Sequence, residues 1–545
     1  MNSLVLLLIG IALFLGAYTV YGAYLAKEWG IDPKRKTPAY TLRDDIDYCP
    51  ANAKVLLGHH FSSIAGAGPI TGPIAAAVFG WLPVYLWIVL GSIFVGGVHD
   101  WGALFASVRH DGKSIGEIIR VNIGENGKKL FNYFAYLTLI LVVAAFTDIC
   151  ASTFAFDPAK PEALTGARAG TASILFIVLA MAFGFFVYRR GAKLSVATVT
   201  GVALLFFCIW IGYQFPVFKL SKFAWDLVLI AYIYAASTLP VWLLLQPRDY
   251  LCSFLLYSML AGAILGVLLV RPAMAIPATV GFTVGEGAKA QFLFPMLFVT
   301  VACGAISGFH SLVGSGTTSK QLDNEKDTKL IGYGAMLIEG VVAMIALISA
   351  SYIVGAKGTP AQIFAGGVSE FMSKFGVPVP IGSVFVILAF SAFALTSLDT
   401  ATRIGRYMFQ EMTTRPDGTK MLGNNMYVAT AITVGLSALL LSYGYQKIWP
   451  IFGSANQLLA GLSLLAVSAW LAKSGKKNIM TVIPMIFMFA VTLTALFFVA
   501  KNNFLGGSKV IGILASILFI LAIILIVNTY KLFFGDKSKN QKMNA

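Results

Sequence analysis

Residues 58–73 read GHHFSSIAGAGPITGP and lie inside a long apolar stretch of the chain. Proline removes a backbone donor and glycine loosens the backbone, so this segment predicts a membrane-spanning helix that unwinds near its middle. Backbone groups left unpaired cannot face lipid, where each one costs several kcal/mol. They must face protein or a watery cavity, where freed N–H groups suit a carboxylate and freed carbonyl groups suit a cation.

The whole chain has the composition of a membrane protein. Of its 545 residues, 58% are hydrophobic and 12% are charged, whereas about 25% of the residues in a soluble domain are charged. Apolar stretches recur from end to end, and each is long enough to cross a bilayer as a helix. We predict an all-α polytopic membrane protein with about fifteen transmembrane helices, at residues 4–26, 57–80, 84–106, 130–153, 171–188, 194–215, 225–246, 251–271, 293–316, 331–354, 381–402, 427–444, 448–472, 479–500 and 510–532.

The positive charges predict how these helices are oriented. The formal net charge is +16, and Lys and Arg on one side of a membrane mark its cytoplasmic face. We therefore expect a multi-pass protein of the plasma membrane, with its N-terminus outside and its C-terminus in the cytoplasm. The lipid bilayer explains the basic residues, and no separate basic and aromatic patch predicts binding of nucleic acid. The basic segments follow odd-numbered helices, at 27–36, 109–129, 189–193, 473–477 and 531–542.

A second predicted helix carries a similar interruption. Residues 225–246 contain the segment Ser237-Thr-Leu-Pro240, five helices after the first interruption. Because five is odd, the two helices cross in opposite directions, as an inverted repeat of five helices requires. In the alternative, Pro240 only kinks its helix, which membrane helices tolerate. The repeat divides the chain into an N-terminal span and loop, two five-helix repeats, and peripheral helices with a basic tail, at 1–56, 57–216, 217–425 and 426–545.

Ionisable side chains inside a membrane are functional candidates, because each costs about 2.5–3.5 kcal/mol on insertion scales. Asp100 lies deep within its predicted helix, and we expect it to take part in ion or proton coupling. Asp399 is a second candidate, although Arg403 one helical turn later suggests an ion pair instead. For Asp148 and Glu339 the sequence leaves hydrogen-bonded packing and function both open.

Histidines close to these carboxylates suit proton movement, since imidazole titrates near neutral pH. His59 and His60 begin the first interrupted helix, and His310 lies within a later one; we count all three as coupling candidates. The alternative is an intramembrane metal-dependent enzyme that uses His59, His60, His99 and Asp100. Adjacent histidines on a helix point about 100° apart and rarely reach one ion, so we predict no metal, no cofactor and no catalytic residue.

Residues 307–322 read SGFHSLVGSGTTSKQL, which is rich in hydroxyl groups. Ser311 and Ser315 can coordinate Na⁺ or hydrogen-bond neighbouring helices. The segment lacks the Gly-Lys-Ser/Thr ending of a phosphate-binding loop, so we expect no nucleotide site. Energy for transport must then come from a gradient of H⁺ or Na⁺.

The segments GHHFSSIAGAGPITGP, GGVHDWGALFASVRHDGKSIGEII, SGFHSLVGSGTTSKQL, LTSLDTATRIGRYMFQE and WPIFGSANQLLAGL occur in this order over most of the chain. Together they resemble the carbon starvation protein A (CstA) family of bacterial inner-membrane transporters. That family is associated with peptide uptake, and some members take up pyruvate with protons. The resemblance implies an ion-coupled symporter, induced under carbon starvation, that imports a small carboxylate-bearing nutrient, either a peptide or pyruvate.

The resemblance also implies positions for the binding sites. The family is grouped with the amino acid–polyamine–organocation superfamily, whose core is the five-plus-five inverted repeat of the LeuT type. A sodium-type site would lie between the first interruption and the helix of Ser311 and Ser315. Substrate would lie against both interruptions, at Gly66, Gly68, Thr71, Gly72, Ser237 and Thr238.

Overall fold

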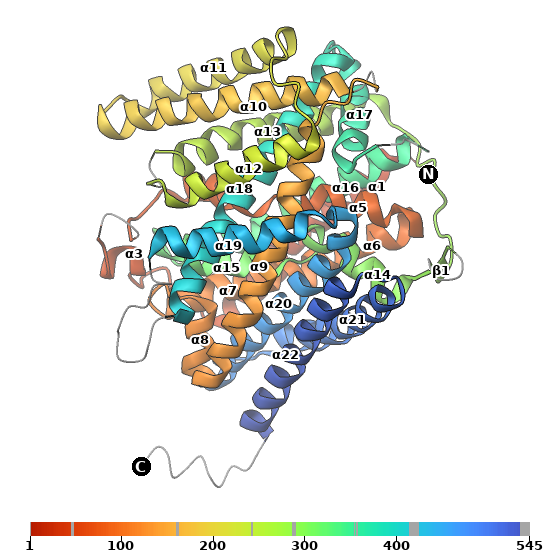
Figure 1. Ribbon diagram of the computed structural model, residues 1–545. Coiled ribbons are helices and arrows are strands. Elements are labelled where there is room, and N and C mark those ends of the chain that lie inside the picture. The colour runs from red at the N-terminus through yellow and green to blue at the C-terminus, as the bar shows by residue number, and fades with distance from the viewer. Residues whose placement is uncertain are drawn as a thin grey trace.

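The computed structural model describes residues 2–534, apart from 45–47, 160–162, 241–242, 286–289, 354, 356–357 and 414–424. Most of the basic tail expected at 531–542 therefore lies outside the described residues. Helices make up nearly all of the described structure (Figure 1). The exception is a two-stranded antiparallel ribbon formed by β1 (Thr283–Val284) and β2 (Gln291–Phe292).

The first part of the chain forms one long helix, a bent helix and the two helices that follow it. The long helix joins α1 (Ser3–Gly16), η1 (Ala17–Tyr21) and α2 (Gly22–Trp29). After the short α3 (Pro38–Thr41), α4 (Ala53–Ile64) and α5 with η2 (Gly68–Phe79) form a pair bent by 46°. The chain continues through α6 (Trp81–Gly91), η3 (Ser92–Gly96), α7 (Gly97–Arg109), α8 (Ile115–Asn122) and α9 (Glu125–Phe154).

The middle of the chain contains a helical hairpin and a second interrupted helix. The hairpin is α10 (Ala163–Gly184) with η4 (Phe185–Arg189) and α11 (Leu194–Gln214), followed by α12 (Lys222–Thr238) and α13 (Leu245–Val270). The interrupted helix consists of α14 (Leu293–Val301), η6 (Ala302–Gly304), α15 (Gly308–Gly316) and η7 (Thr318–Lys320). The remaining elements are η8 (Lys329–Gly334), α16 (Ala335–Tyr352), α17 (Pro360–Ser373), α18 (Val379–Thr413), α19 (Met426–Leu441), α20 (Tyr445–Lys473), α21 (Ile479–Leu505) and α22 (Lys509–Phe534).

The described residues contain 12 helices long and apolar enough to cross a membrane, or 13 when the bent pair counts as one span. The shorter apolar helix α19 and the 17-residue α12 correspond to the other two predicted stretches. The protein is thus an all-α, multi-pass membrane protein, as predicted. We expected about fifteen full-length spans. Two of them, at 225–246 and 427–444, are helices of only 17 and 16 residues in the structure.

The expectation that 225–246 forms one interrupted helix is wrong. Helix α12 ends at Thr238, and α13 starts only at Leu245. Leu239 is extended, with φ −71° and ψ 152°, the conformation that a residue before proline prefers. Pro240 therefore ends a helix instead of kinking it.

Two arginines stabilise the end of α12. Arg403 Nη2 donates to the carbonyl oxygens of Ala236 and Leu239 at 2.9 and 2.8 Å. Arg406 Nη1 donates to the carbonyl oxygen of Ser237 at 2.6 Å. These carbonyl groups have no partner inside the helix, and the two guanidinium groups supply one.

The second interruption lies in the helix predicted at 293–316. Ala302 has φ +40° and ψ −117°, a left-handed conformation that is unusual for alanine. The chain becomes helical again only at Gly308. This break contains no proline, so local sequence does not signal it.

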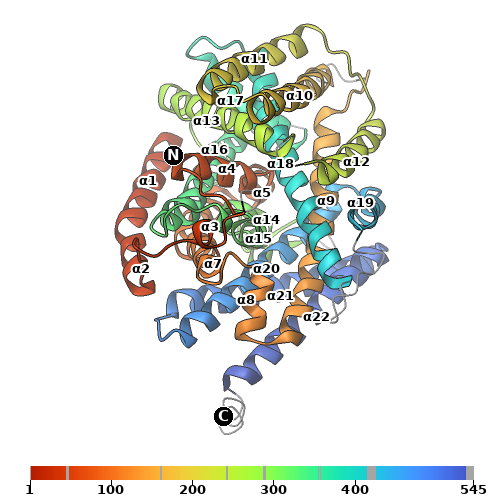
Figure 2. The same ribbon diagram turned by 90° about the vertical axis from the view of Figure 1, so that its left-hand side faces the viewer.

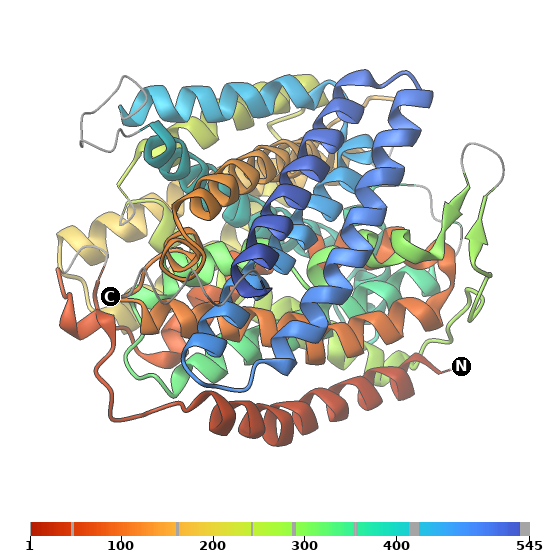
Figure 3. The ribbon, with the colours of Figure 1, turned by 90° about the horizontal axis from the view of Figure 1, so that it is seen from below.

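Helices α9 and α18 form the centre of the protein and pack against each other. Within an apolar stretch of 18 residues in each helix, 94% of the residues of α9 and 89% of those of α18 are buried, but only 22% of those of α11. Figure 2 shows the α10–α11 hairpin at one end of the molecule and α21 and α22 at the other, with α1 and α2 along one side. Figure 3 shows α1 and α2, in red, following one edge of the molecule.

The packing partners of two sets of helices correspond. Helix α4 packs against α13 as α15 packs against α20. In the same way, α5 packs against α16 as α15 packs against α7. The short helix α8 contacts α9 and α20, and α17 contacts α18 and α13. Helices α12 and α19 each contact both α9 and α18. Contacts in the set α4–α13 thus have equivalents in the set α14–α20, apart from the added α10–α11 hairpin.

Candidate substrate and ion site

The two interruptions lie directly against each other. A Cβ atom built on Gly68 would lie 2.5 Å from Cys303 Sγ, and one built on Gly72 would lie 2.4 Å from the carbonyl oxygen of Val301. Only glycine allows this approach, because real Cβ atoms are not found so close to other heavy atoms. The start of α5 is therefore in contact with the end of α14 and with η6.

The backbone at the first interruption keeps free donors. No side chain caps the N-terminus of α5. Pro69 has no N–H group, and the Ile70 N–H donates to the carbonyl oxygen of Ala67 at 3.3 Å. The N–H groups of Ala67 and Gly68 are therefore the ones that can point out of the helix, at the positive end of its dipole. The start of α15 differs, because the Phe309 N–H donates to Asn456 Oδ1 at 2.9 Å. The α5 end is thus the one that offers amide groups to an anionic ligand.

The central helices α9 and α18 line the same interruption. A Cβ atom on Gly66 would lie 2.6 Å from Ser397 Oγ and 2.9 Å from the ring of Phe146. Ser397 Oγ donates to the carbonyl oxygen of Ser63 at 3.1 Å. Thr71 is 1% exposed, and its hydroxyl has no hydrogen-bond partner among the described residues. The expected residues Gly66, Gly68, Thr71 and Gly72 therefore share one enclosed region.

Four buried ionisable side chains form a continuous network beside the second interruption. His99 Nδ1 donates to Asp100 Oδ1 at 2.7 Å, and His310 Nδ1 donates to Asp100 Oδ2 at 2.7 Å. His310 Nε2 faces Glu339 Oε2 at 3.4 Å. All four residues are between 0% and 3% exposed. The structure thus brings together Asp100 and His310, two separate coupling candidates, and Glu339 joins them.

Three helices position this network next to the second interruption. His99 and Asp100 are on α7, His310 is in the first turn of α15, and Glu339 is on α16. The His310 N–H donates to the carbonyl oxygen of Ser307 at 3.2 Å, at the end of the interruption. A movement of the interrupted segment would therefore move the His310 ring relative to its two carboxylate partners.

A second buried charge cluster joins α12, α13 and α18. The Arg248 guanidinium pairs with Asp399 and, at 3.2 Å, with Asp249, and it also donates to the Tyr232 hydroxyl. Tyr232 Oη donates to Asp399 Oδ2 at 2.8 Å. Asp399 therefore pairs with Arg248. The sequence instead suggested an ion pair with Arg403, one helical turn after Asp399. Arg403 instead caps α12.

The sequence reasoning missed Arg248, Asp249 and Tyr232. It placed residues 247–250 in a connection between two helices, whereas α13 already begins at Leu245. Arg248 and Asp249 are each 1% exposed. Two adjacent ionisable residues at the start of an apolar run were the available signal, and their cost in lipid would have made them candidates.

The two histidines of α4 contact different partners. His59 Nδ1 lies 3.8 Å from Asp249 Oδ2, at the second cluster. His60 Nδ1 hydrogen-bonds to Thr318 Oγ1 at 2.8 Å. Neither contact involves His99 or Asp100, so the four residues of the enzyme alternative are not assembled. Among the described residues, no group of three or more His, Cys, Asp or Glu side chains is placed to hold a metal ion.

The hydroxyl groups expected at a sodium-type site form hydrogen bonds within α15 and with α20. Ser311 Oγ donates to the carbonyl oxygen of Gly308 and lies 2.8 Å from Ser463 Oγ on α20. Ser315 Oγ donates to the carbonyl oxygen of Ser311 at 2.7 Å. These contacts point toward α20 and along α15, and not toward the first interruption.

Ser237 and Thr238 lie at the end of α12. Thr238 Oγ1 donates back to the carbonyl oxygens of Tyr234 and Ala235, and the backbone of Ser237 is held by Arg406. Neither residue is among the nearest neighbours of Gly66, Gly68 or Gly72, which are instead residues of α9, α14, η6 and α18. The residues that the structure places against the first interruption thus include Thr300, Val301, Cys303 and Gly304.

Asp148 connects three helices. Its carboxylate pairs with Lys222 at the start of α12, at 2.5 Å, and accepts a hydrogen bond from the Tyr445 N–H at the start of α20, at 2.7 Å. Asp148 is itself 1% exposed. These contacts give Asp148 a role in packing.

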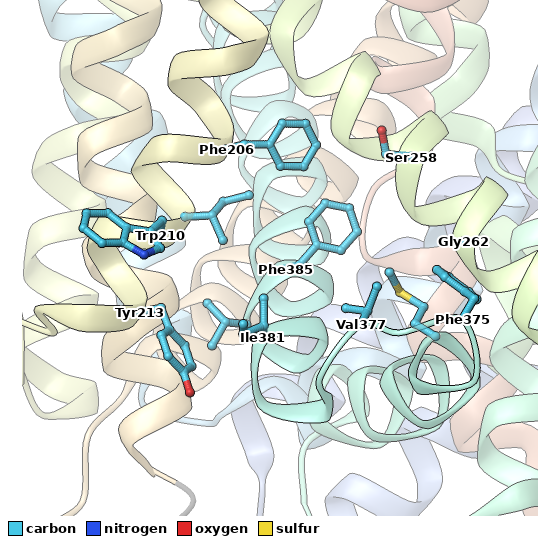
Figure 4. A pocket seen from close by; sticks show the side chains of 12 residues that line it. Phe206, Trp210, Tyr213, Ser258, Gly262, Phe375, Val377, Ile381 and Phe385 are labelled. Carbon is cyan, nitrogen blue, oxygen red and sulfur yellow. The ribbon is translucent and has the colours of Figure 1, made fainter.

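A cavity lies away from both interruptions. Its volume is about 330 Å³, and it opens between α11, α13, α17 and α18 (Figure 4). Its lining is aromatic and aliphatic and contains no ionisable acid or base of the Asp, Glu, His, Lys or Arg type. This cavity offers no partner for the charge of a small carboxylate, so the interruptions remain the candidate site.

Comparisons with known proteins agree on one class. The chain matches the family described as carbon starvation protein CstA over residues 2–357 and 353–495. It is 32% identical to the peptide transporter CstA of Escherichia coli K12, over 91% of this chain and 80% of that protein. It is 31% identical to the pyruvate/proton symporter BtsT of the same strain, over 91% of this chain and 81% of that protein.

A third relative covers nearly the whole chain, and a solved structure shares the fold. The peptide transporter CstA of Bacillus subtilis 168 is 31% identical over 97% of both chains. A crystal structure of a manganese transporter from Eremococcus coleocola aligns with a TM-score of 0.52 at 12% identity, over 90% of this chain and 99% of that one. At this identity the likeness concerns the fold alone.

The multi-pass helical fold and these relatives define a membrane transporter, and not an enzyme. The chain belongs to the carbon starvation protein CstA family.

Proposed function

We propose that the protein imports a small carboxylate-bearing nutrient together with protons. The observation that carries this proposal is the contact between the two interruptions, with uncapped amide groups at the start of α5 and a buried His–Asp–His–Glu network one turn beyond the second interruption. An unwound helix in a membrane must satisfy its backbone groups internally, and a bound ligand is one way to do so.

The relatives narrow the substrate class. They are named as peptide transporters and as a pyruvate/proton symporter. Peptides and pyruvate both present a carboxylate, which suits N–H groups at the positive end of a helix. We propose that Gly66, Gly68, Thr71 and Gly72 bind this group, together with the segment Val301–Ser307.

The buried network supports H⁺ as the coupling ion. Imidazole and carboxylate groups in a chain can hold and pass a proton near neutral pH. The hydroxyls of Ser311 and Ser315 donate to carbonyl oxygens of their own helix and so give less support to Na⁺. We propose His310 and Asp100 as parts of the coupling site, and His59, His60 and Asp399 as parts of the region around α4 that changes contacts during transport.

The corresponding packing of the two helix sets supports an inverted repeat. We propose that the repeats are α4–α13 and α14–α20, so that they divide at the loop 271–292 and not at residue 217. The two interrupted helices then occupy equivalent positions in the repeats. With the N-terminus outside, α4 would lie on the cytoplasmic side of the first interruption and α5 on the outer side.

Reconstitution into proteoliposomes tests this function. Labelled pyruvate and a labelled dipeptide are each supplied with an imposed pH gradient, an imposed sodium gradient, or neither. We expect one of the two substrates to accumulate above its external concentration only with the pH gradient, inside alkaline. Accumulation driven by sodium alone would contradict proton coupling, and no uptake of either substrate would contradict the substrate class.

A further inference from the structure

The four members of the buried network differ in how fully their polar atoms are satisfied. Asp100 accepts a hydrogen bond on each carboxylate oxygen, from His99 and from His310. A carboxylate that accepts two such bonds is stabilised in its ionised form. Asp100 is therefore a fixed counter-ion that orients the two imidazole rings.

His99 Nε2 and His310 Nε2 each lack a hydrogen-bond partner among the described residues, but Glu339 is the member whose side chain has none at all. Neither of its carboxylate oxygens has a hydrogen-bond partner among the described residues, and His310 Nε2 faces one of them at 3.4 Å. The residue is 0% exposed. A buried ionised carboxylate without hydrogen bonds is costly, and binding a proton removes that cost.

The surroundings of Glu339 leave His310 as its main charged neighbour. The His310 ring on α15 lies between Glu339, at 3.4 Å from Nε2, and Asp100 on α7, at 2.7 Å from Nδ1. Helices α1 and α5 pack against α16 and contain no ionisable side chain. From α6, the Tyr85 hydroxyl donates to the carbonyl oxygen of Leu6. One proton on Glu339 therefore changes the charge that faces the His310 ring.

The charge of the network has two states. An ionised Glu339 adds one negative charge to the network. A proton on Glu339 removes that charge, while every hydrogen bond of Asp100 is kept. Loading and release of one proton thus need no change at Asp100.

Glu339 is also close to the part of the protein that must move. Its neighbour Gly340 packs against Ser92, whose hydroxyl donates to the carbonyl oxygen of Gly304 at 3.2 Å, in the second interruption. A Cβ atom on Gly304 would lie 2.8 Å from the Cβ atom of Ala343, one turn after Glu339. The charge on Glu339 is therefore adjacent to the backbone that we propose contacts the substrate.

We propose that Glu339, and not Asp100, takes up and releases the coupling proton, and that His310 links it to the interrupted helix; this inference rests on the proton coupling proposed above. On the outer side a proton from water forms an O–H bond on the Glu339 carboxylate. On the inner side that bond breaks and the proton returns to water. No other bond is made or broken, and Asp100 keeps its charge throughout.

Two assays on the same proteoliposomes separate this role from a packing role. The first measures accumulation driven by a pH gradient, and the second measures exchange of labelled for unlabelled substrate at equal pH on both sides. In Glu339→Gln we expect accumulation to fall to simple equilibration, because the coupling is lost, while exchange continues and no longer depends on pH. In Asp100→Asn we expect both activities to fall, since the two rings lose their anchor.

Further variants control for folding and general charge effects. Glu370→Gln, on the exposed side of α17, removes a carboxylate outside the network, and both activities should match the wild type. If Glu339→Gln loses exchange as well, Glu339→Asp decides: partial recovery of pH-driven accumulation supports the proposal, and no recovery in a folded protein overturns it. Undiminished accumulation in Glu339→Gln also overturns it. A wild-type protein that ignores the pH gradient would instead contradict the proposed function itself.

Discussion

Arg248 on α13 and Asp399 on α18 form an ion pair whose side chains are 1% and 0% exposed. The Tyr232 hydroxyl completes the pair from α12. Helices α12, α13 and α18 are thus joined through one guanidinium group. Because water cannot replace a lost partner at this depth, each member depends on the others.

Removing one member of this pair should destabilise the protein strongly. We expect Arg248→Gln to cost about 3–5 kcal/mol, because it leaves a buried carboxylate without its partner. The double variant Arg248→Gln/Asp399→Asn should cost less than the sum of the two single variants. Thermal unfolding in detergent measures the effect.

The exposed pair of Lys477 and Glu28 provides the control for that experiment. Lys477 is 68% exposed in its side chain, and surface pairs contribute about 0–1 kcal/mol. Lys477→Gln should therefore leave the unfolding temperature nearly unchanged. Equal effects of Arg248→Gln and Lys477→Gln would show that the buried pair does not hold the three helices together.

The contact between the two interruptions should not tolerate a side chain at Gly72. A methyl group there would lie 2.4 Å from the carbonyl oxygen of Val301, which is backbone and cannot rotate away. We expect Gly72→Ala to lose uptake and about 1–3 kcal/mol of stability. Uptake assays and thermal unfolding of the same preparation measure both.

Gly435 on α19 is a matched position, since a Cβ atom there meets nothing within 4 Å. Gly435→Ala should keep uptake and gain a little stability, because alanine favours a helix by about 0.5–1 kcal/mol over glycine. Normal uptake in Gly72→Ala would mean that the close approach of the two segments is not needed for transport.

The residues that end α12 should be less important for transport than the sequence suggested. Thr238 Oγ1 donates to backbone carbonyl groups of its own helix, and Arg406 donates to the carbonyl oxygen of Ser237, whose hydroxyl has no partner among the described residues. We expect Ser237→Ala and Thr238→Val to keep the Michaelis constant for the substrate. A large rise of that constant in either variant would return these two residues to the substrate site.

Much of the fold could be predicted because it depends on local sequence. Long apolar runs predict spans, and the glycines and prolines of residues 66–73 predict the first interruption at its correct place. Pro240 gave an equally strong local signal, but it ends α12, because Arg403 and Arg406 supply partners for the freed carbonyl groups. A proline shows where a helix cannot continue, and tertiary contacts decide whether the chain resumes as the same helix.

The second interruption and the pair of Arg248 and Asp399 could not be predicted in this way. The left-handed conformation of Ala302 has no sequence signal, and closely packed neighbours such as Gly68 and Gly96 surround that segment. Asp399 has Arg403 at helical spacing, yet it pairs with a residue 151 positions away. Such pairings depend on which helices become neighbours.

Asp148 should prove to be a packing residue. Its carboxylate holds Lys222 and the start of α20, so Asp148→Asn should cost about 1–3 kcal/mol in stability. Once folded, that variant should still accumulate substrate with a pH gradient. Loss of accumulation in a protein of normal stability would instead place Asp148 in the coupling pathway.

Cys303 gives the most direct test of the central claim, that the substrate binds where the two interruptions meet. It lies in η6 against Gly68 and is 4% exposed. In a protein whose other cysteines, at positions 49, 150, 208 and 252, are replaced by alanine or serine, a small thiol reagent should label Cys303 slowly, and saturating substrate should slow the labelling further. Labelling that is the same with and without a transported substrate would contradict the claim.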